Sequence, residues 1–206
     1  MRIVDMTRDP RRSQYEYFRT FVHPYASMTV NCDITHLRRV TRERELPFFL
    51  TLLHCAVNAA NAVPELRRRI RGETVVEYER CISSHTVALP DETYCYCELD
   101  CGKPLEAFLP YALAEVERAK SCPTMDDGDD PDRLFFVSSV PWVSFASISL
   151  PKPVPADSNP RITFGKYFTQ GDKVLLPVDL TVNHALADGI HMAKFFEEFT
   201  RRAETI

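Results

Sequence analysis

The residues best suited to do chemistry are His184 and, four positions later, Asp188. They lie between a strand-like stretch, residues 173–181, and an amphipathic, helix-like stretch, residues 190–201. A strand-to-helix junction presents side chains to a cleft, because the regular elements on either side fix them. Imidazole changes charge near neutral pH, so His184 is a candidate general base. The structural alternative is a histidine that caps the helix or lies on the surface.

The elements around this junction predict the fold class. Apolar periodicity and start and stop signals indicate helices at residues 9–22, 47–62, 105–119 and 190–201. Alternation indicates strands at residues 27–33, 74–78, 85–89, 94–99, 134–140, 143–150, 161–168 and 174–182. Because helices and strands do not alternate one to one, we expect an α/β two-layer sandwich, with a mixed β-sheet and helices packed on one face. A chain of 206 residues fits a single domain, residues 1–206.

Composition narrows the range of partners. The net charge is −4 at pH 7, so no global basic field indicates nucleic acid. The run Arg67-Arg68-Arg69 with Arg71 is interpreted as a solvated helix end, and contact with an anionic ligand is the alternative. No apolar run reaches the roughly 18 residues of a membrane-spanning helix, and residues 1–5 lack the apolar core of a secretory signal. We therefore expect no membrane partner and a cytoplasmic location.

Metal and cofactor motifs are also missing from the sequence. The seven cysteines show no disulfide framework, and only Cys95, Cys97 and Cys101 cluster. No histidine is close to them in sequence, so reduced thiols are a better interpretation than metal ligands. The acidic stretch 126–130 lacks the spacing of a calcium loop, and the six glycines form no phosphate-binding or dinucleotide-binding pattern. We expect no metal and no permanently bound cofactor, which leaves a base without an attached nucleophile.

Three C-terminal segments together resemble one known family. Residues 183–189, Asn-His-Ala-Leu-Ala-Asp-Gly, resemble the His-His-x-x-x-Asp-Gly signature of chloramphenicol acetyltransferase and related coenzyme-A-dependent acyltransferases. Residues 141–147, Pro-Trp-Val-Ser-Phe-Ala-Ser, resemble the family's Pro-Trp-Val segment with its serine. Residues 163–173 resemble the strand before the signature. The segments occur in the family's order, and residues 11–35 also match, so the resemblance spans nearly the whole chain.

The resemblance implies a reaction and three catalytic residues. His184 corresponds to the general base, which takes the proton of an acceptor hydroxyl as the hydroxyl oxygen attacks the thioester carbonyl of acetyl-CoA. Ser147 corresponds to the donor to the developing oxyanion, and Thr163 to a threonine that holds a water near the tetrahedral intermediate. The transfer is direct, within a ternary complex. Taken alone, Ser147 also fits a solvent-facing position on a strand.

Supporting roles follow from the same resemblance. It pairs Asp188 with an N-terminal arginine, Arg11 or, one register away, Arg12, whereas on its own Asp188 could simply cap the following helix. His191 is interpreted as packing. The family is a homotrimer whose active sites lie between subunits, with the base from one subunit and much of the acceptor pocket from its neighbour. The implied substrate contacts are Lys166 and Tyr167 for coenzyme A and Phe18 for the acceptor pocket.

The chain departs from the family pattern at three places. Asn183 replaces the first histidine of the signature, a position that does not act as the base. Residues 150–161 are short and rich in proline where the family shapes its acceptor pocket. Arg161 stands where the family carries an apolar pocket residue, and it could recognise an anionic or polar acceptor or turn to solvent or a carboxylate. The departures leave the base and the oxyanion donor intact and alter the part that selects the alcohol.

Three functional hypotheses result. The leading one is O-acetylation of chloramphenicol, an antibiotic-resistance reaction, with acetyl-CoA as co-substrate. The second keeps this chemistry and changes the acceptor to another hydroxylated xenobiotic or metabolite. The third is a non-catalytic module of the same fold that binds coenzyme A or another ligand.

Overall fold

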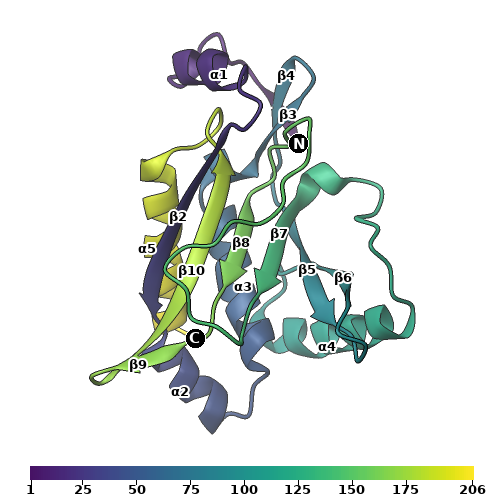
Figure 1. Cartoon of the computed structure of the whole chain (residues 1–206), viewed down its shortest axis with the longest axis vertical. Coiled ribbons are helices and arrows are strands. Elements are labelled where there is room, and N and C mark those ends of the chain that lie inside the picture. Colours follow the sequence, from purple (N-terminus) through teal and green to yellow (C-terminus); the bar gives the residue numbers. More distant parts are fainter.

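The computed structural model describes residues 1–206 and contains helices and strands in an irregular order (Figure 1). The helices are α1 (Arg12–Phe18), α2 (Thr35–Glu43), α3 (Phe48–Asn61), α4 (Leu105–Ser121) and α5 (Gly189–Glu204), with short 3₁₀ helices at Pro64–Arg67 and Pro131–Arg133. The strands are β1 (Arg2–Val4), β2 (Tyr25–Asp33), β3 (Arg68–Arg71), β4 (Thr74–Glu77), β5 (Ile82–Ala88), β6 (Tyr94–Leu99), β7 (Leu134–Ser139), β8 (Arg161–Phe164), β9 (Phe168–Gln170) and β10 (Lys173–Asn183).

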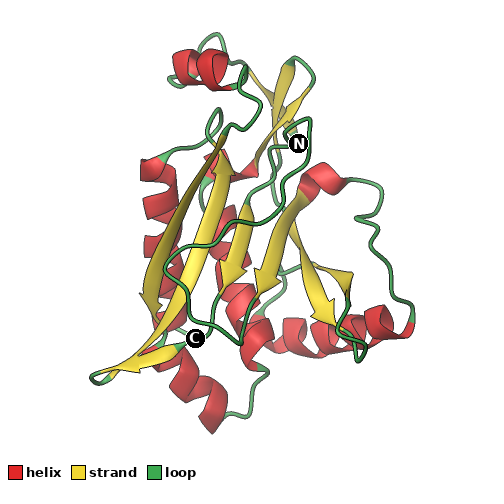
Figure 2. Cartoon of the chain, viewed as in Figure 1, coloured by secondary structure: helices red, strands yellow, loops and turns green.

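The main sheet has seven strands and mixed polarity. Its order is β2-β10-β8-β7-β5-β6, and β9 pairs with the beginning of β10. The pairs β5–β7 and β7–β8 are parallel and the others are antiparallel. Helices α3, α4 and α5 lie behind the sheet in Figures 1 and 2, and the segment 140–160 crosses its opposite face. The predicted α/β class, a mixed sheet with helices on one face, is confirmed.

A smaller sheet of three strands lies at one end of the molecule. Its order is β1-β4-β3, and all its pairs are antiparallel. Together with α1 it forms the upper part of the view in Figure 1. Helix α1 is shorter than the predicted helix 9–22, and α2 and β1 were not predicted.

The core lies between the helices and the main sheet. Helix α3 is apolar around most of its circumference and packs against α5, which contributes Phe195 and Phe199, both fully buried. Burying one such side chain stabilises the fold by about 1.5–3 kcal/mol. The prediction that residues 47–62 form a helix buried on several sides is correct. The buried residues of α3 are Leu50, Thr51, Leu52, Leu53, Cys55, Ala56, Val57, Ala59 and Ala60.

The longest strand, β10, lies near the middle of this arrangement. It pairs with β2 on one side and with β8 on the other, and it is buried from Leu176 to Asn183. Its apolar side chains join the helix-side core, whereas Asp179 and Thr181 face the other way and bond to hydroxyls of β2. A strand held on both edges is a rigid support for whatever follows it, and the next residue is His184.

Residues 143–150 do not form the predicted strand. No strand occurs between the end of β7 at Ser139 and the start of β8 at Arg161. The apolar alternation is present, but a strand also needs a partner edge, and β7 is already paired with β5 and β8. The segment therefore crosses the sheet face, and the predicted strand 161–168 is interrupted between Phe164 and Phe168 where the Lys166 amide bonds to the Val143 carbonyl at 2.9 Å.

The arginine run is also not a solvated helix end. Residues Arg68–Arg71 form β3, and the side chain of Arg69 is fully buried. Its guanidinium donates to the carbonyls of Leu66 (2.8 Å) and Leu134 (2.9 Å) and stacks on Phe135. Backbone carbonyls therefore satisfy a buried charge that the sequence pattern places at the surface. None of the helices has the length and apolar character needed to cross a bilayer.

Candidate active site

The end of β10 and the start of α5 define a short, closely bonded turn. Two amides, those of Leu186 and Ala187, donate to the Asn183 carbonyl, and the His184 amide donates to the Pro24 carbonyl at 2.6 Å. The Asn183 side chain accepts from the Ala185 amide at 3.0 Å. These bonds fix the backbone on both sides of His184, so the ring has a defined place at the strand-to-helix junction.

The His184 ring is held in one tautomer. Its Nδ1 lies 3.0 Å from the Ala187 carbonyl oxygen, which can only accept, so Nδ1 carries the proton and donates. The ring also stacks on Phe18, with centroids 4.1 Å apart and planes 29° apart. The Nε2 lone pair of the neutral ring therefore remains available. This is the arrangement that a general base requires.

Asp188 combines the two roles that the sequence left open. As the N-cap of α5 it accepts from the Ile190 amide at 3.3 Å, and its other oxygen pairs with Arg11. Arg11 also donates to the His184 carbonyl at 3.0 Å, whereas Arg12 pairs with Glu16 on the surface. Burial favours a raised pKa for Asp188, but the hydrogen bond and charge of Arg11 outweigh it and lower that pKa. The ionised Asp188 therefore connects Arg11 to the start of α5 and stabilises the turn that carries His184.

His191 completes the start of α5. Its ring is buried, and Nδ1 accepts from the Asp188 amide at 3.2 Å. Burial lowers the pKa of His191, against the opposing effect of Glu65 and Asp188, so the ring is neutral at pH 7. The side chain belongs to the capping arrangement of the helix.

A large cavity lies between the main sheet, the segment 140–160 and the first turns of α3, from which Phe48, Phe49 and Leu52 line it. Its volume is about 1480 Å³, and four of the residues singled out from the sequence line it: Arg161, Thr163, Lys166 and Tyr167. Thr163 is almost fully buried in β8, and its hydroxyl has no hydrogen-bond partner in the chain. Lys166 is exposed, and Tyr167 packs against Phe48 and Arg38. From these residues the cavity therefore has the Thr163 hydroxyl, the Lys166 ammonium group and the Tyr167 ring.

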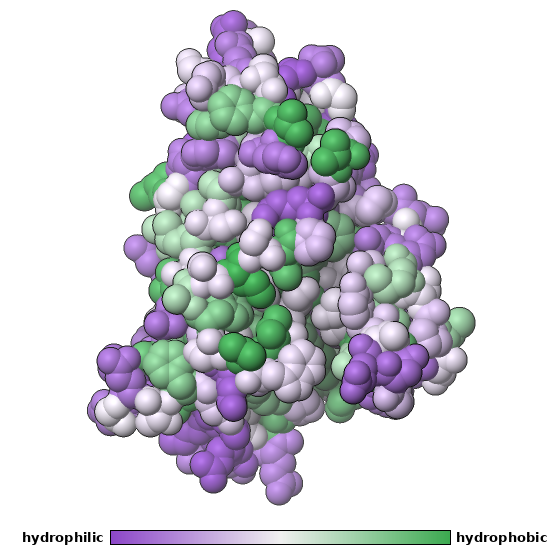
Figure 3. All heavy atoms as spheres, viewed as in Figure 1, coloured by the Kyte–Doolittle hydropathy of each residue, from purple (hydrophilic) through white to green (hydrophobic).

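The single chain divides the predicted site into separate parts. His184, Phe18, Arg11, Asp188 and Asn183 lie together at the turn, and none of them lines the cavity. Ser147 is exposed in the irregular segment 140–160 and contributes to neither group. Exposed apolar side chains of the same segment include Trp142 (73% exposed) and Val154 (71%), and Figure 3 shows apolar residues gathered over this face.

The sequence analysis missed two residues of the site region, Asp157 and Tyr25. Asp157 forms a two-pronged ion pair with Arg161, at 2.6 and 2.8 Å, and exchanges hydrogen bonds with the Tyr25 hydroxyl. The backbone carbonyl of Asp157 accepts from Asn183 at 2.9 Å. The one available signal was an acidic residue four positions before the unusual Arg161, inside a proline-rich and therefore stiff segment.

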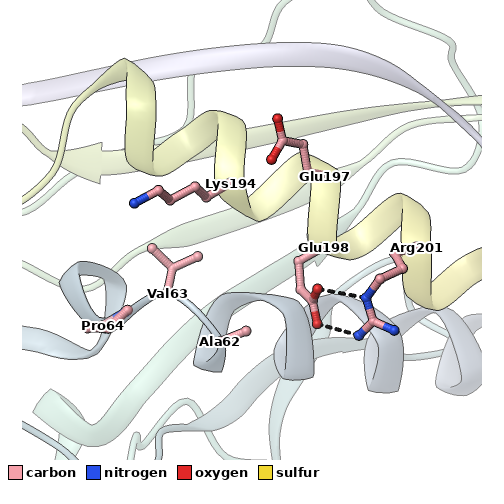
Figure 4. Close-up of a pocket in the computed structure, with 7 residues that line it drawn as sticks. All are labelled: Ala62, Val63, Pro64, Lys194, Glu197, Glu198 and Arg201. Atoms are coloured by element: carbon pink, nitrogen blue, oxygen red, sulfur yellow. Dashed lines mark hydrogen bonds and ion pairs between the residues drawn. The ribbon is translucent and has the colours of Figure 1, made fainter.

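A second, smaller pocket lies between α3 and α5 (Figure 4). Its volume is about 430 Å³. The Glu198 and Arg201 side chains at its edge pair with each other, so their charges are satisfied within the helix. Its other charged side chains, Lys194 and Glu197, are exposed to solvent on α5.

Comparison with known proteins identifies the family. The sequence model of the chloramphenicol acetyltransferase family matches residues 1–200. Chloramphenicol acetyltransferase 3 of Escherichia coli is 30% identical over 189 residues, which are 90% of this chain and 88% of that protein. The enzyme of Proteus mirabilis is 28% identical over 95% of this chain and 91% of its own length. A solved chloramphenicol acetyltransferase structure superposes with a TM-score of 0.85 at 20% identity, over 98% of both chains. The chain therefore belongs to the chloramphenicol acetyltransferase family and is an acyltransferase.

Proposed function

We propose that this protein transfers the acetyl group of acetyl-CoA to a hydroxyl of a small acceptor, with chloramphenicol as the first candidate. The observation that carries the proposal is the His184 ring, whose Nδ1 donates to the Ala187 carbonyl, so that the lone pair of the neutral ring is on Nε2. The family relatives named above are chloramphenicol acetyltransferases, which supports the same co-substrate and acceptor.

The proposed reaction proceeds without an acyl-enzyme. His184 Nε2 takes the proton of the acceptor hydroxyl while the hydroxyl oxygen attacks the thioester carbonyl carbon. The resulting oxyanion accepts a hydrogen bond from the Ser147 hydroxyl, and Thr163 holds a water beside the intermediate. The intermediate then expels the CoA thiolate, which takes the proton back from the His184 imidazolium. Acetyl ester and CoA leave, and the neutral ring is restored.

Contacts with coenzyme A are assigned to Lys166 and Tyr167. The Lys166 ammonium group is exposed at the mouth of the cavity, where it suits the phosphate groups of coenzyme A. Tyr167 is 38% exposed, so one part of its ring is free while Phe48 and Arg38 support the other. Phe18 stacks on the base and forms the acceptor side of the turn.

The complete site is proposed to form between subunits of a homotrimer. Within one chain the histidine turn and the cavity have no lining residue in common, which is expected when each subunit supplies one half. The exposed Trp142 and Val154 suit burial against a neighbour. Six of the seven cysteines are buried free thiols, which fits the proposed cytoplasmic location.

Mixing two inactive variants tests the shared site. His184→Ala lacks the base, and Ser138→Trp fills the cavity, which Ser138 lines. If sites form between subunits, trimers assembled from an equal mixture regain about one quarter of the wild-type sites, because each site then needs one intact half from each partner. A mixture with no more activity than the separate variants contradicts the shared site. Light scattering of the wild-type protein gives the oligomeric state directly.

Release of CoA from acetyl-CoA in the presence of chloramphenicol tests the reaction itself. His184→Ala should lower kcat by about 10²–10⁴. Ser147→Ala should lower it by about 10²–10³, and Ser149→Ala, an exposed serine of the same segment, is the matched control. Retention of most activity by His184→Ala would falsify the assigned base. A wild-type protein that binds acetyl-CoA and acetylates a different alcohol indicates the second hypothesis, and ligand binding without turnover of any acceptor indicates the third.

A further inference from the structure

The three departures from the family pattern meet at one residue, Asp157. Its carboxylate holds Arg161 through two hydrogen bonds, at 2.6 and 2.8 Å. Its backbone carbonyl accepts from the Asn183 side chain at 2.9 Å. It also lies within the short proline-rich segment 150–161. The unusual asparagine, loop and arginine are therefore parts of one connected structure.

Arg161 forms a fixed part of the cavity wall. Its side chain is 11% exposed, and its guanidinium carbon lies 5.7 Å from the Tyr25 ring centroid and 5.3 Å from that of Phe136. Both Arg161 and Asp157 line the cavity. Two aromatic contacts and a two-pronged ion pair leave a planar group little rotational freedom, so the orientation of its remaining donors is set before a ligand arrives.

One edge of this guanidinium makes no hydrogen bond within the chain. Nη1 donates to Asp157 and to the Asn159 carbonyl (3.0 Å), and Nη2 donates to the other carboxylate oxygen of Asp157. Nε has no partner, and in contrast to the Nε atoms of Arg69 and Arg80 it is not sealed in the interior. An accessible N–H donor in a cavity wall offers a hydrogen bond to a ligand.

The charges around Arg161 define which ligand group suits this donor. Asp157 already neutralises the guanidinium, and a second carboxylate, Asp127, lines the same cavity. Among the other charged residues that line the cavity, Asp127 and Glu92 outnumber Lys166, so an incoming carboxylate would meet no net positive charge and would lose its hydration. A neutral oxygen, as in a carbonyl, nitro or sulfonyl group, can accept the N–H bond without that cost.

The wall is also tied to the rigid end of β10. Asn183 donates to the Asp157 carbonyl and accepts from the Ala185 amide, so it bridges the loop and the histidine turn. Through Asn183, the end of β10, which is paired on both edges, limits how far the segment 150–161 can move. Asn183 acts as a positioning residue for the wall.

We infer that Arg161, held by Asp157 and anchored by Asn183, is the specificity-determining residue of the acceptor cavity, and that it selects hydroxylated acceptors carrying a neutral oxygen that accepts a hydrogen bond. This inference rests on the proposed function, because the part of the cavity around Arg161 is taken as the acceptor site, beside the coenzyme A contacts assigned to Lys166 and Tyr167.

Calorimetric binding of four ligands tests the inference without requiring turnover. The ligands are chloramphenicol and three analogues: one without the ring nitro group, one without the dichloroacetyl group and one with a ring carboxylate replacing the nitro group. Wild-type protein should bind chloramphenicol at least about tenfold more tightly than the carboxylate analogue. The same difference is expected for at least one of the analogues that lack the nitro or the dichloroacetyl group. The double variant Asp157→Asn/Arg161→Met, which removes both charges together, should reduce the ratios to within about twofold.

Two further variants serve as controls for the binding ratios. Arg161→Lys keeps the ion pair but lacks the planar fork, so it should lose the same ratios even if the double variant does not fold. Arg39→Met/Glu43→Gln removes an exposed pair on α2 with the same four-residue spacing and should leave the ratios unchanged.

The outcomes distinguish the inference about Arg161 from the proposed acetyl transfer. Equal ratios in wild type, Arg161→Lys and the double variant overturn the inference, as does tightest binding of the carboxylate analogue or failure of all four ligands to bind any of the proteins. Release of CoA is measured in parallel. Chloramphenicol that binds with the expected ratios but is not acetylated contradicts the proposed function and leaves the role of Arg161 intact.

Discussion

The contact between Arg11 and Asp188 gives the sharpest prediction for stability. The Arg11 side chain is 10% exposed and that of Asp188 is 31% exposed, so removal of the carboxylate leaves a largely buried guanidinium without its counter-charge. Asp188→Asn keeps an oxygen for the helix cap and removes only the charge. A fully buried pair would cost about 3–5 kcal/mol to break, and the partial exposure of Asp188 reduces this to about 2 kcal/mol. Asp188→Ala also loses the cap, for a total of about 3 kcal/mol.

Denaturant unfolding at pH 7 measures these free energies. The neighbouring exposed pair supplies the control, since Arg12→Met should leave the unfolding midpoint unchanged. The pKa of Asp188 is lowered in the folded state, so its contribution is present above the unfolded value of 3.8 and is lost as the pH falls through the folded value. The difference between wild type and Asp188→Asn should therefore narrow below pH 3.8. An Asp188→Asn midpoint equal to that of wild type, or a difference independent of pH, refutes the structural role.

Three further changes test other parts of the fold. Phe18→Leu keeps apolar bulk but loses the ring stacked on His184, so kcat should fall roughly tenfold with little change in the KM for acetyl-CoA; an unchanged kcat contradicts the positioning role. Burial lowers the pKa of His85 from 6.5 to about 4, so wild type should lose about 3 kcal/mol of stability between these pH values, a loss that His85→Gln removes; equal pH slopes refute this. Gly171, at the β9–β10 turn, has φ +62° with open space at its Cβ, so Gly171→Ala should cost about 1 kcal/mol through backbone strain alone, and an unchanged unfolding midpoint excludes that strain.

The sequence was most informative where local pattern and tertiary role agree. The pattern of residues 173–181 predicts a strand, and the following motif places His184 just after it; both are observed. Helix α3 was predicted for the same reason, since apolar residues cover most of its circumference. In these elements the local conformational preference of each residue and its tertiary packing favour the same structure.

Prediction failed where the structure depends on distant partners. The segment 143–150 has the alternation of a strand, but the strands on either side of it in the chain, β7 and β8, are already paired on both edges. Arg69 can be buried because its guanidinium donates hydrogen bonds to the nearby Leu66 carbonyl and to the distant Leu134 carbonyl. A local sequence pattern does not show which strand edges are unpaired or which distant carbonyls can accept a hydrogen bond. The role of Asp157 was missed for the same reason, because it exists only through contacts with Tyr25, Asn183 and Arg161.

The bond between Arg11 and Asp188 joins residues separated by 177 positions. During synthesis Arg11 leaves the ribosome long before its partner is translated, and the pairing of β2 with β10 must likewise wait until β10 has been made. Contacts at such separation form late and slowly. The turn that carries His184 is thus one of the last parts of the molecule to take shape, and a nascent chain that ends before α5 contains every strand but lacks the helix that follows the histidine turn.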